Sequence, residues 1–280
     1  MKWTVDPSEL CLQASCLARD FSLAPSDAAR RSVLRWLAAS GAALAAGGLA
    51  PRAAEADART ADSSCIQSAE ATTGPFPADG GGPFPDRRNV LLNGAVVRSD
   101  IRTSFGSSAT LAPGISLRLS FNLLDLRRGC TPLTQGAVYL WSCDCNGDYS
   151  LYAPGLEHEN YLRGVQFADS QGQVRFHTIF PACYAGRYPH LHAEIFTGAG
   201  TNFKQLTRVL TTQFIVPPNI CAQVYSRTQG YERSNSNFRA TPISSDIVFS
   251  SSSEAQLAAQ TLALAGDPDH GYSATANIVA

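Results

Sequence analysis

Apolar and polar residues alternate over short stretches of this chain and only rarely recur at helical spacing. The clearest case is residues 115–121, where the two kinds of side chain alternate over the whole stretch, as in a half-buried β-strand. Other segments are short and rich in β-branched and aromatic residues, which favours strands. They are residues 137–141, 173–179, 191–196 and 211–216.

Turn-forming residues separate these segments, at positions 128–129, 146–147, 170–172, 197–200 and 217–219. Residues 73–86 are rich in Gly and Pro and predict an extended loop, because proline is excluded from central strands. Residues 254–264 are the one stretch with the apolar spacing of a helix. We therefore expect an all-β fold, a β-sandwich of mostly antiparallel strands with long loops and little helix.

Composition and charge narrow the range of possible functions. The chain has 280 residues, of which 44% are hydrophobic and 16% charged, and its net charge is -1. This length is sufficient for one substantial core, and the near-neutral charge gives no reason to expect a nucleic-acid partner or an anionic membrane surface. The sequence contains no phosphate-binding loop, no dinucleotide fingerprint and no Gly-x-Ser-x-Gly elbow.

The first 56 residues predict an export signal. Arg30 and Arg31 precede an apolar stretch, residues 36–50, which is shorter than the ~20 residues needed to span a bilayer. Small residues around position 55 offer a cleavage site, and the arginine pair resembles a bacterial twin-arginine signal. We expect residues 57–280 to form one periplasmic or extracellular domain without stable membrane insertion; a retained signal anchor is the alternative.

Cysteine usage agrees with export. Two of the eight cysteines lie in the expected signal, and the other six are Cys65, Cys130, Cys143, Cys145, Cys183 and Cys221. An even number in an exported domain predicts up to three disulfides, whose pairing the sequence does not decide.

The chemistry of the chain centres on His190 and His192. Residues two apart on a strand face the same side, so both imidazoles can reach one ion, and Tyr184 offers a further donor nearby. A phenol ionises only near pH ~10, but a strongly charged cation stabilises its phenolate. This mixture of donors points to ferric iron. The alternative is a histidine pair that is exposed or hydrogen-bonded in the core.

The surrounding segments resemble the intradiol ring-cleavage dioxygenases, and in particular their smaller secreted members. The matching runs are residues 138–144, 147–150, 162–164, 172–179, 184–192 and 211–214. The resemblance extends over about residues 63–275. One departure stands out, because residues 181–184 read Pro-Ala-Cys-Tyr where the family usually has Pro-Gly-x-Tyr.

The resemblance implies a non-haem Fe(III) cofactor held by two tyrosines and two histidines, which are Tyr149, Tyr184, His190 and His192. It makes Tyr184 the phenolate that leaves when substrate binds, so that it also acts in catalysis, and Tyr149 the one that stays. It places Arg187 beside the substrate ring and gives Gln213 a role in placing substrate or oxygen. Structural roles, as a loop arginine and a strand-end amide, are the alternatives for these two.

The implied function is that of an oxidoreductase. It would cleave a catechol-type ring between its two hydroxylated carbons and add both atoms of O2, giving a muconate-type diacid. Two other hypotheses fit the same residues. One is a non-catalytic exported β-sandwich that binds aromatic or carbohydrate ligands, and the other is a different His-x-His metalloenzyme with copper or manganese.

Four other residues have side chains that can bind a metal but lie in sequence settings that do not favour it. His158 lies in a charged loop, His270 in a turn, and His177 on a strand where a hydrogen bond is expected. Tyr152 follows Tyr149 by three positions but lacks its Gly-x-Tyr context. We do not expect these four to bind the metal.

Overall fold

The computed structural model describes residues 65–81, 88–198, 200 and 203–280. They belong to one compact unit, Ala58–Ala280. The expected export signal, residues 1–56, lies outside the described residues, so it stays a prediction. Within the described part of the chain, no helix is both long and apolar enough to cross a membrane.

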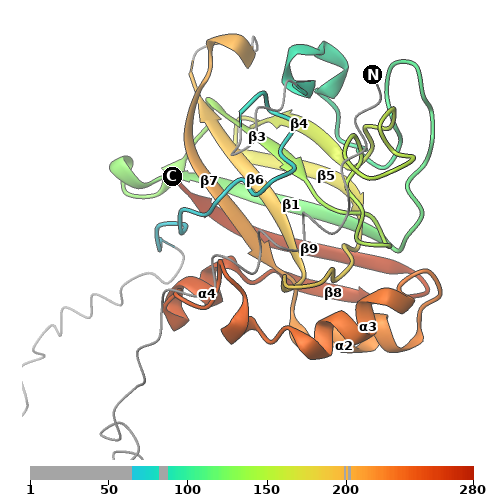
Figure 1. Cartoon of the computed structure of the whole chain (residues 1–280). Coiled ribbons are helices and arrows are strands. Elements are labelled where there is room, and N and C mark those ends of the chain that lie inside the picture. Colours follow the sequence, from blue (N-terminus) through green and yellow to red (C-terminus); the bar gives the residue numbers. More distant parts are fainter. Residues whose placement is uncertain (1–64, 82–87, 199, 201–202) are drawn as a thin grey trace, which may run out of the picture. The chain divides into compact units, whose positions relative to one another are not determined.

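Two β-sheets form the body of this unit (Figure 1). The strands of the first sheet are β1 (Ser116–Asp125), β2 (Thr131–Pro132), β5 (Gln173–Ile179), β8 (Ala263–Asp267) and β9 (Gly271–Val279). Strand β1 is central, with β9 parallel on one side and β5 and β2 antiparallel on the other. The second sheet is wholly antiparallel in the order β4 (Arg163–Phe167), β3 (Gly136–Trp141), β6 (His190–Thr197) and β7 (Thr207–Ile215).

The core lies between the two sheets. Alternate residues of β1 point into it, namely Leu117, Leu119, Phe121 and Leu123, and none is more than 1% exposed. Phe121 stacks on Phe214 of β7, with ring centroids 4.7 Å apart, so the two inner faces are in contact. The predicted all-β sandwich is confirmed.

The second sheet is buried on its other face as well. Every residue of β3 is buried, and seven of the eight residues of β6 are. Residues 65–81, the covering segment, lie over this face and cross β7 and β6 in Figure 1. Its backbone is tied to β7, since Ala71 N donates to Thr211 O and the Gln213 side chain donates to Thr72 O. This covered face carries the candidate site.

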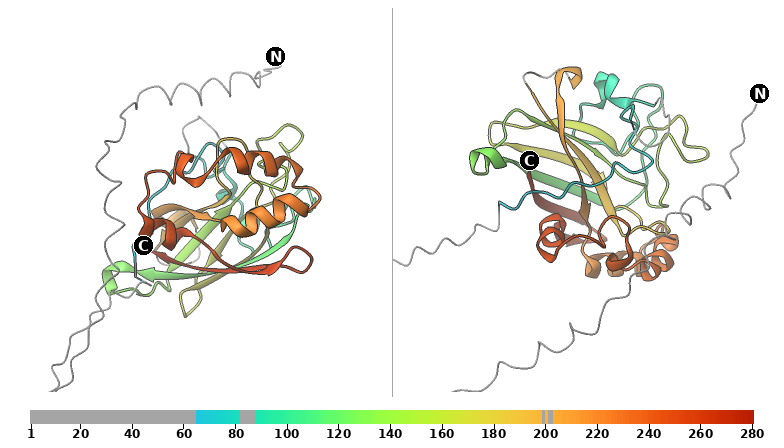
Figure 2. Two further views of the ribbon diagram at one scale, coloured as in Figure 1. Left: turned by 90° about the horizontal axis from the view of Figure 1, so that it is seen from below. Right: turned by 60° about the vertical axis from the view of Figure 1, so that its left-hand side comes forward.

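Three α-helices of the described chain gather at one end of the sandwich (Figures 1 and 2). They are α2 (Pro218–Arg227), α3 (Glu232–Ala240) and α4 (Glu254–Gln260), and short 3-10 turns occur at Val90–Leu92, Gly94–Val96, Leu126–Arg128, Phe203–Gln205 and Ile243–Ser245. The expectation of a single helix was wrong. Pro218, assigned to a turn, starts α2, because the first helical position needs no free N–H.

The predicted helix over 254–264 begins at the right residue but ends early. Ser253 caps α4 through a capping box with Gln256. Thr261 ends the helix, and Ala263 already belongs to β8, which pairs with β9. Sheet pairing therefore overrides the helical spacing beyond Gln260.

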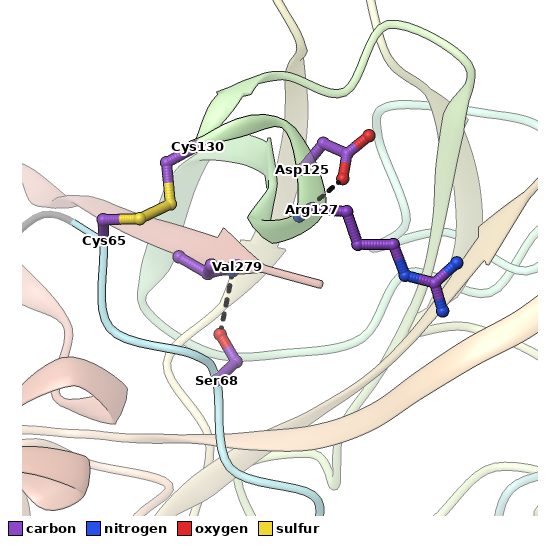
Figure 3. The surroundings of a disulfide bond; sticks show 6 residues. All are labelled: Cys65, Ser68, Asp125, Arg127, Cys130 and Val279. Atoms are coloured by element: carbon purple, nitrogen blue, oxygen red, sulfur yellow. Dashed lines mark hydrogen bonds between the residues drawn. A yellow bond between two sulfur atoms is a disulfide. The ribbon is translucent and has the colours of Figure 1, made fainter.

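One disulfide joins Cys65 to Cys130, with their Cα atoms 5.8 Å apart (Figure 3). It anchors the start of the covering segment beside the turn after β1. Ser68 adds a second anchor, because its backbone N–H and its hydroxyl both bond to Val279 of β9. The other four cysteines of the domain, Cys143, Cys145, Cys183 and Cys221, are free and buried. Of the up to three disulfides expected, the described residues form one.

Candidate metal centre and active site

Four donor atoms converge on the covered face of the second sheet. His190 Nε2 lies 3.0 Å from His192 Nε2. Tyr184 Oη lies 3.3 Å from His190 Nε2, and Tyr149 Oη lies 3.2 Å from His192 Nε2. The structure thus brings together the four residues that the sequence singled out as iron ligands.

The two histidines owe their placement to β6. They stand two residues apart at its start and so face the same side, and each is only 2% exposed. His190 Nδ1 is 2.5 Å from Tyr188 O, to which it donates, so the bare lone pair of that ring is on Nε2. The His192 ring instead lies flat against Trp141, with centroids 4.8 Å apart and planes inclined by 9°.

The two tyrosines come from loops that pass close to each other. Tyr149 lies in the loop after β3, and Tyr184 in the loop between β5 and β6. Gly147 has φ +90°, and a Cβ there would lie 3.0 Å from Tyr184 Cβ, so the approach of the loops requires glycine. Asp144 shapes the same turn by accepting bonds from the N–H groups of Asn146 and Asp148.

Burial sets the protonation of the four donors. It lowers the pKa of His190 to about 3 and holds the pKa of His192 well below its usual value, so both imidazoles are neutral. Burial also raises the pKa of Tyr184 to about 12, although the charge of Arg187 opposes the rise, and it raises the pKa of Tyr149. The imidazoles thus offer lone pairs at neutral pH, whereas the phenols ionise only beside a strongly charged cation.

The donor set fits a single first-row metal ion. Two nitrogens about 2.1 Å from a common ion and about 90° apart would lie about 3.0 Å from each other, as the histidine nitrogens do. The described residues contain no group of three or more His, Cys, Asp or Glu side chains placed to bind a metal. This site is not such a group, because half of its donors are tyrosines. Carboxylate-free tyrosine and histidine ligation suits a hard trivalent ion better than zinc or calcium.

Arg187 and Gln213 lie beside this cluster and contact each other. Arg187 Nη2 donates to Gln213 Oε1 at 2.6 Å, and Arg187 Nε donates to Asp246 Oδ2 at 3.0 Å. Burial works against the charge of Arg187, but Tyr184 and Asp246 outweigh it and raise its pKa. The guanidinium therefore remains a fixed cation, held on two sides. Sequence reasoning missed Asp246, a lone aspartate in a Ser-rich stretch that no motif marks.

The covering segment closes over the donors. Phe76 packs on Tyr149, with ring centroids 4.9 Å apart. A Cβ on Gly74 would lie 3.3 Å from His192 Cε1, so the backbone passes close to that imidazole. Arg163, fully buried, donates to the carbonyl oxygens of Phe76 and Ser150 and so links this segment to the Tyr149 loop. Sequence reasoning saw Arg163 only as part of a matching run.

Three of the four residues judged unsuitable have side-chain partners other than the donors. His177 Nε2 is 2.8 Å from Ser116 Oγ, and its Nδ1 faces Asp100, so the expected hydrogen bonding is confirmed. His270 pairs with Asp267 in an exposed turn. The Tyr152 hydroxyl accepts a bond from Ala78 N.

Comparisons with known proteins agree on the family. The family model described as Dioxygenase matches residues 97–214, a stretch that contains the four donors, Arg187 and Gln213 and ends before Asp246. Chlorocatechol 1,2-dioxygenase of Rhodococcus opacus is 28% identical over 103 residues, which are 37% of this chain and 37% of that protein. The match thus spans little more than a third of this curated relative.

Solved structures show the same fold. An intradiol ring-cleavage dioxygenase of Tetranychus urticae superposes with a TM-score of 0.55 at 22% identity, covering 77% of this chain and 94% of that one. A second solved dioxygenase gives a TM-score of 0.57 at the same identity and coverage. Residues 97–214 thus match a dioxygenase family model, and the described domain shares the fold of solved intradiol ring-cleavage dioxygenases.

Proposed function

We propose that this protein is a ferric-iron-dependent dioxygenase that cleaves a catechol-type ring between its two hydroxylated carbons. The observation that carries the proposal is the convergence of two phenol oxygens and two imidazole nitrogens within 3.0–3.3 Å of their neighbours. Tyr149, Tyr184, His190 and His192 would hold the iron. The chemistry that bound ferric iron supplies is Lewis-acid activation of the diol toward O2.

The two tyrosines differ in a way that suits different roles. Tyr149 is 3% exposed and lies beneath Phe76, whereas Tyr184 is only partly buried and precedes the exposed residues Ala185 and Gly186. Tyr184 would therefore be the side chain that moves aside and takes a proton on Oη when a diol enters. Tyr149 remains in place.

Arg187 and Gln213 would receive the ring. The Arg187 cation lies next to Tyr184 and raises the stability of negative charge there, so it also favours a diol that arrives and loses its protons. Gln213 holds the guanidinium from the other side and is itself fixed by Thr72 O at 2.8 Å. Both atoms of O2 enter the diacid product, so the reaction requires no external reductant.

Oxygen uptake tests the proposal. Iron-loaded protein is mixed with catechol, hydroxyquinol or protocatechuate in an oxygen electrode, and the product is identified by mass spectrometry. We expect uptake of one O2 per diol and a product heavier by two oxygen atoms with at least one diol. Protein that binds iron and diols without consuming oxygen would instead be a binding protein, and activity that follows copper or manganese would replace iron.

We also propose that the domain is exported after folding and that its signal is removed near Asp57. The arginine pair and apolar stretch of the signal support this, and so does the Cys65–Cys130 disulfide, since such bonds persist mainly in oxidising compartments. N-terminal sequencing of the protein from a periplasmic or culture fraction tests it. A chain that starts at Met1 and stays with membranes would favour the signal anchor.

A further inference from the structure

Asp246 is a fully buried carboxylate outside the stretch matched by the family model. It follows the 3-10 turn Ile243–Ser245 at the helical end of the sandwich. One oxygen, Oδ1, accepts bonds from the N–H groups of Val248 and Phe249, at 2.8 and 3.1 Å. These bonds fix the carboxylate to its own loop. The other oxygen is thereby directed at the site.

Oδ2 makes two bonds that reach different parts of the site. The first comes from Arg187 Nε at 3.0 Å, and because Gln213 binds Nη2, the guanidinium plane is held at two corners. The second comes from the backbone N–H of Tyr188 at 2.6 Å. The carbonyl of the same Tyr188 accepts the bond from His190 Nδ1 at 2.5 Å.

The backbone of Tyr188 thus connects Asp246 to a metal ligand. The bond at Tyr188 O sets which nitrogen of His190 is bare and how its ring is turned. A shift of Tyr188 would tilt that ring as well as the guanidinium that precedes it in sequence. Arg187 and His190 would therefore lose their alignment together.

We infer that Asp246 is a positioning residue, in which one buried carboxylate aligns both the substrate-side Arg187 and the ligand-side His190. The inference rests on the proposed function in so far as Arg187 faces the diol. It assigns a role to a residue that touches neither the metal donors nor the substrate. It also explains why a carboxylate rather than an amide stands here, since the Asp246 side chain accepts four N–H donors and provides none.

The test begins with Asp246→Asn, which keeps the size of the side chain but turns one acceptor into a donor. Asp267→Asn is the matched control, because Asp267 also accepts backbone N–H groups at a turn, but its side chain is 47% exposed and bonds no arginine in the described structure. Two quantities are measured, kcat per bound iron and the rate at which a chelator removes iron. We expect Asp246→Asn to lower kcat per iron about 10- to 100-fold, the range for small misplacements of catalytic groups, and to speed iron release.

Asp267→Asn should change neither quantity. A double-mutant cycle then separates positioning from general stability. In an Arg187→Gln background, Asp246→Asn should have little further effect on kcat per iron, because the group it aligns is gone, yet it should still speed iron release. An equal loss of kcat in both backgrounds, or a loss of thermal stability with unchanged kcat per iron and iron release, would overturn the inference.

Two other outcomes remain decisive. If the wild-type protein consumes no oxygen with any diol, the proposed function fails, while iron release still tests the link from Asp246 to His190. If Asp246→Asn does not fold, the double variant with Arg187→Gln leaves no unpaired buried guanidinium and is compared with Arg187→Gln alone. Faster iron release from the double variant supports the inference, and equal rates contradict it.

Discussion

The indole of Trp141 lies parallel to the imidazole of His192, at a centroid distance of 4.8 Å. The two residues are partners across β3 and β6, so the sheet register itself creates the stack. Among the described residues, His192 Nδ1 has no hydrogen-bond partner. The orientation of this imidazole therefore comes from packing, on Trp141 and against Gly74, whereas that of His190 is set by a hydrogen bond at Nδ1.

The contact at Gly74 makes a first prediction. Gly74→Ala would add a methyl group 3.3 Å from His192 Cε1 at a position with φ +70°. Gly106→Ala is the matched control, since Gly106 has φ +85° and nothing within 4 Å of the added atom. Both variants should lose about 1–2 kcal/mol of stability to backbone strain. Only Gly74→Ala should release iron several-fold faster to a chelator, and equal release rates would show that the segment does not support His192.

The tyrosines allow a similar comparison. Tyr149→Phe removes a donor hydroxyl and should abolish iron retention, as measured by metal analysis, while the metal-free protein still folds. Tyr152→Phe removes the acceptor for Ala78 N and should lower the free energy of unfolding by about 1–3 kcal/mol, the cost of an unsatisfied polar group. It should retain iron. Retention of iron by Tyr149→Phe would move the metal site elsewhere.

The disulfide should contribute mainly to stability. Cys65 and Cys130 are 65 residues apart, and closing a loop of that length stabilises a fold by about 4 kcal/mol in the chain-entropy account. The double variant Cys65→Ser/Cys130→Ser should lose about that much in urea unfolding. Reductant should destabilise the wild type equally and leave the variant unchanged. A variant with the wild-type midpoint would contradict this role.

The four free cysteines should be unreactive in the folded protein. Burial raises the pKa of Cys145 to about 11 and of Cys183 to about 12, and it raises the pKa of Cys143 and Cys221. Each thiol stays protonated at pH values below its raised pKa. Alkylation of the native protein should therefore remain slow even at pH 9. Peptide mapping after alkylation checks this, with urea-unfolded protein as the labelled control. Rapid labelling of the native protein would contradict the burial of these thiols.

Much of the sandwich could be predicted from the sequence, because strands that bury one face alternate visibly. Residues 173–179 match β5 in full, and the short apolar runs at 137–141 and 191–196 lie within β3 and β6. Strand β9 was missed, because its Ala, Ser and Thr residues form no clear apolar alternation. Helix α3 was missed as well, because it is polar and contains few strong helix formers.

The residues of the candidate site also differ in how well the sequence alone predicts them. The four candidate donors lie in compact motifs, so residue type and spacing are enough to select them. Asp246 and Gly74 act through contacts across more than 50 residues of sequence, and no local pattern marks such contacts. The same holds for the choice of Cys130 as the partner of Cys65, which depends on the path of the covering segment.

The most direct measurement of the central claim is metal analysis together with a visible absorption spectrum of the purified domain. Two phenolates bound to ferric iron should give one iron per chain and a red protein whose colour fades when a chelator removes the metal. Tyr149→Phe prepared in parallel should be colourless. A wild-type protein that stays colourless after reconstitution with ferric iron, or that binds only zinc, would contradict the account.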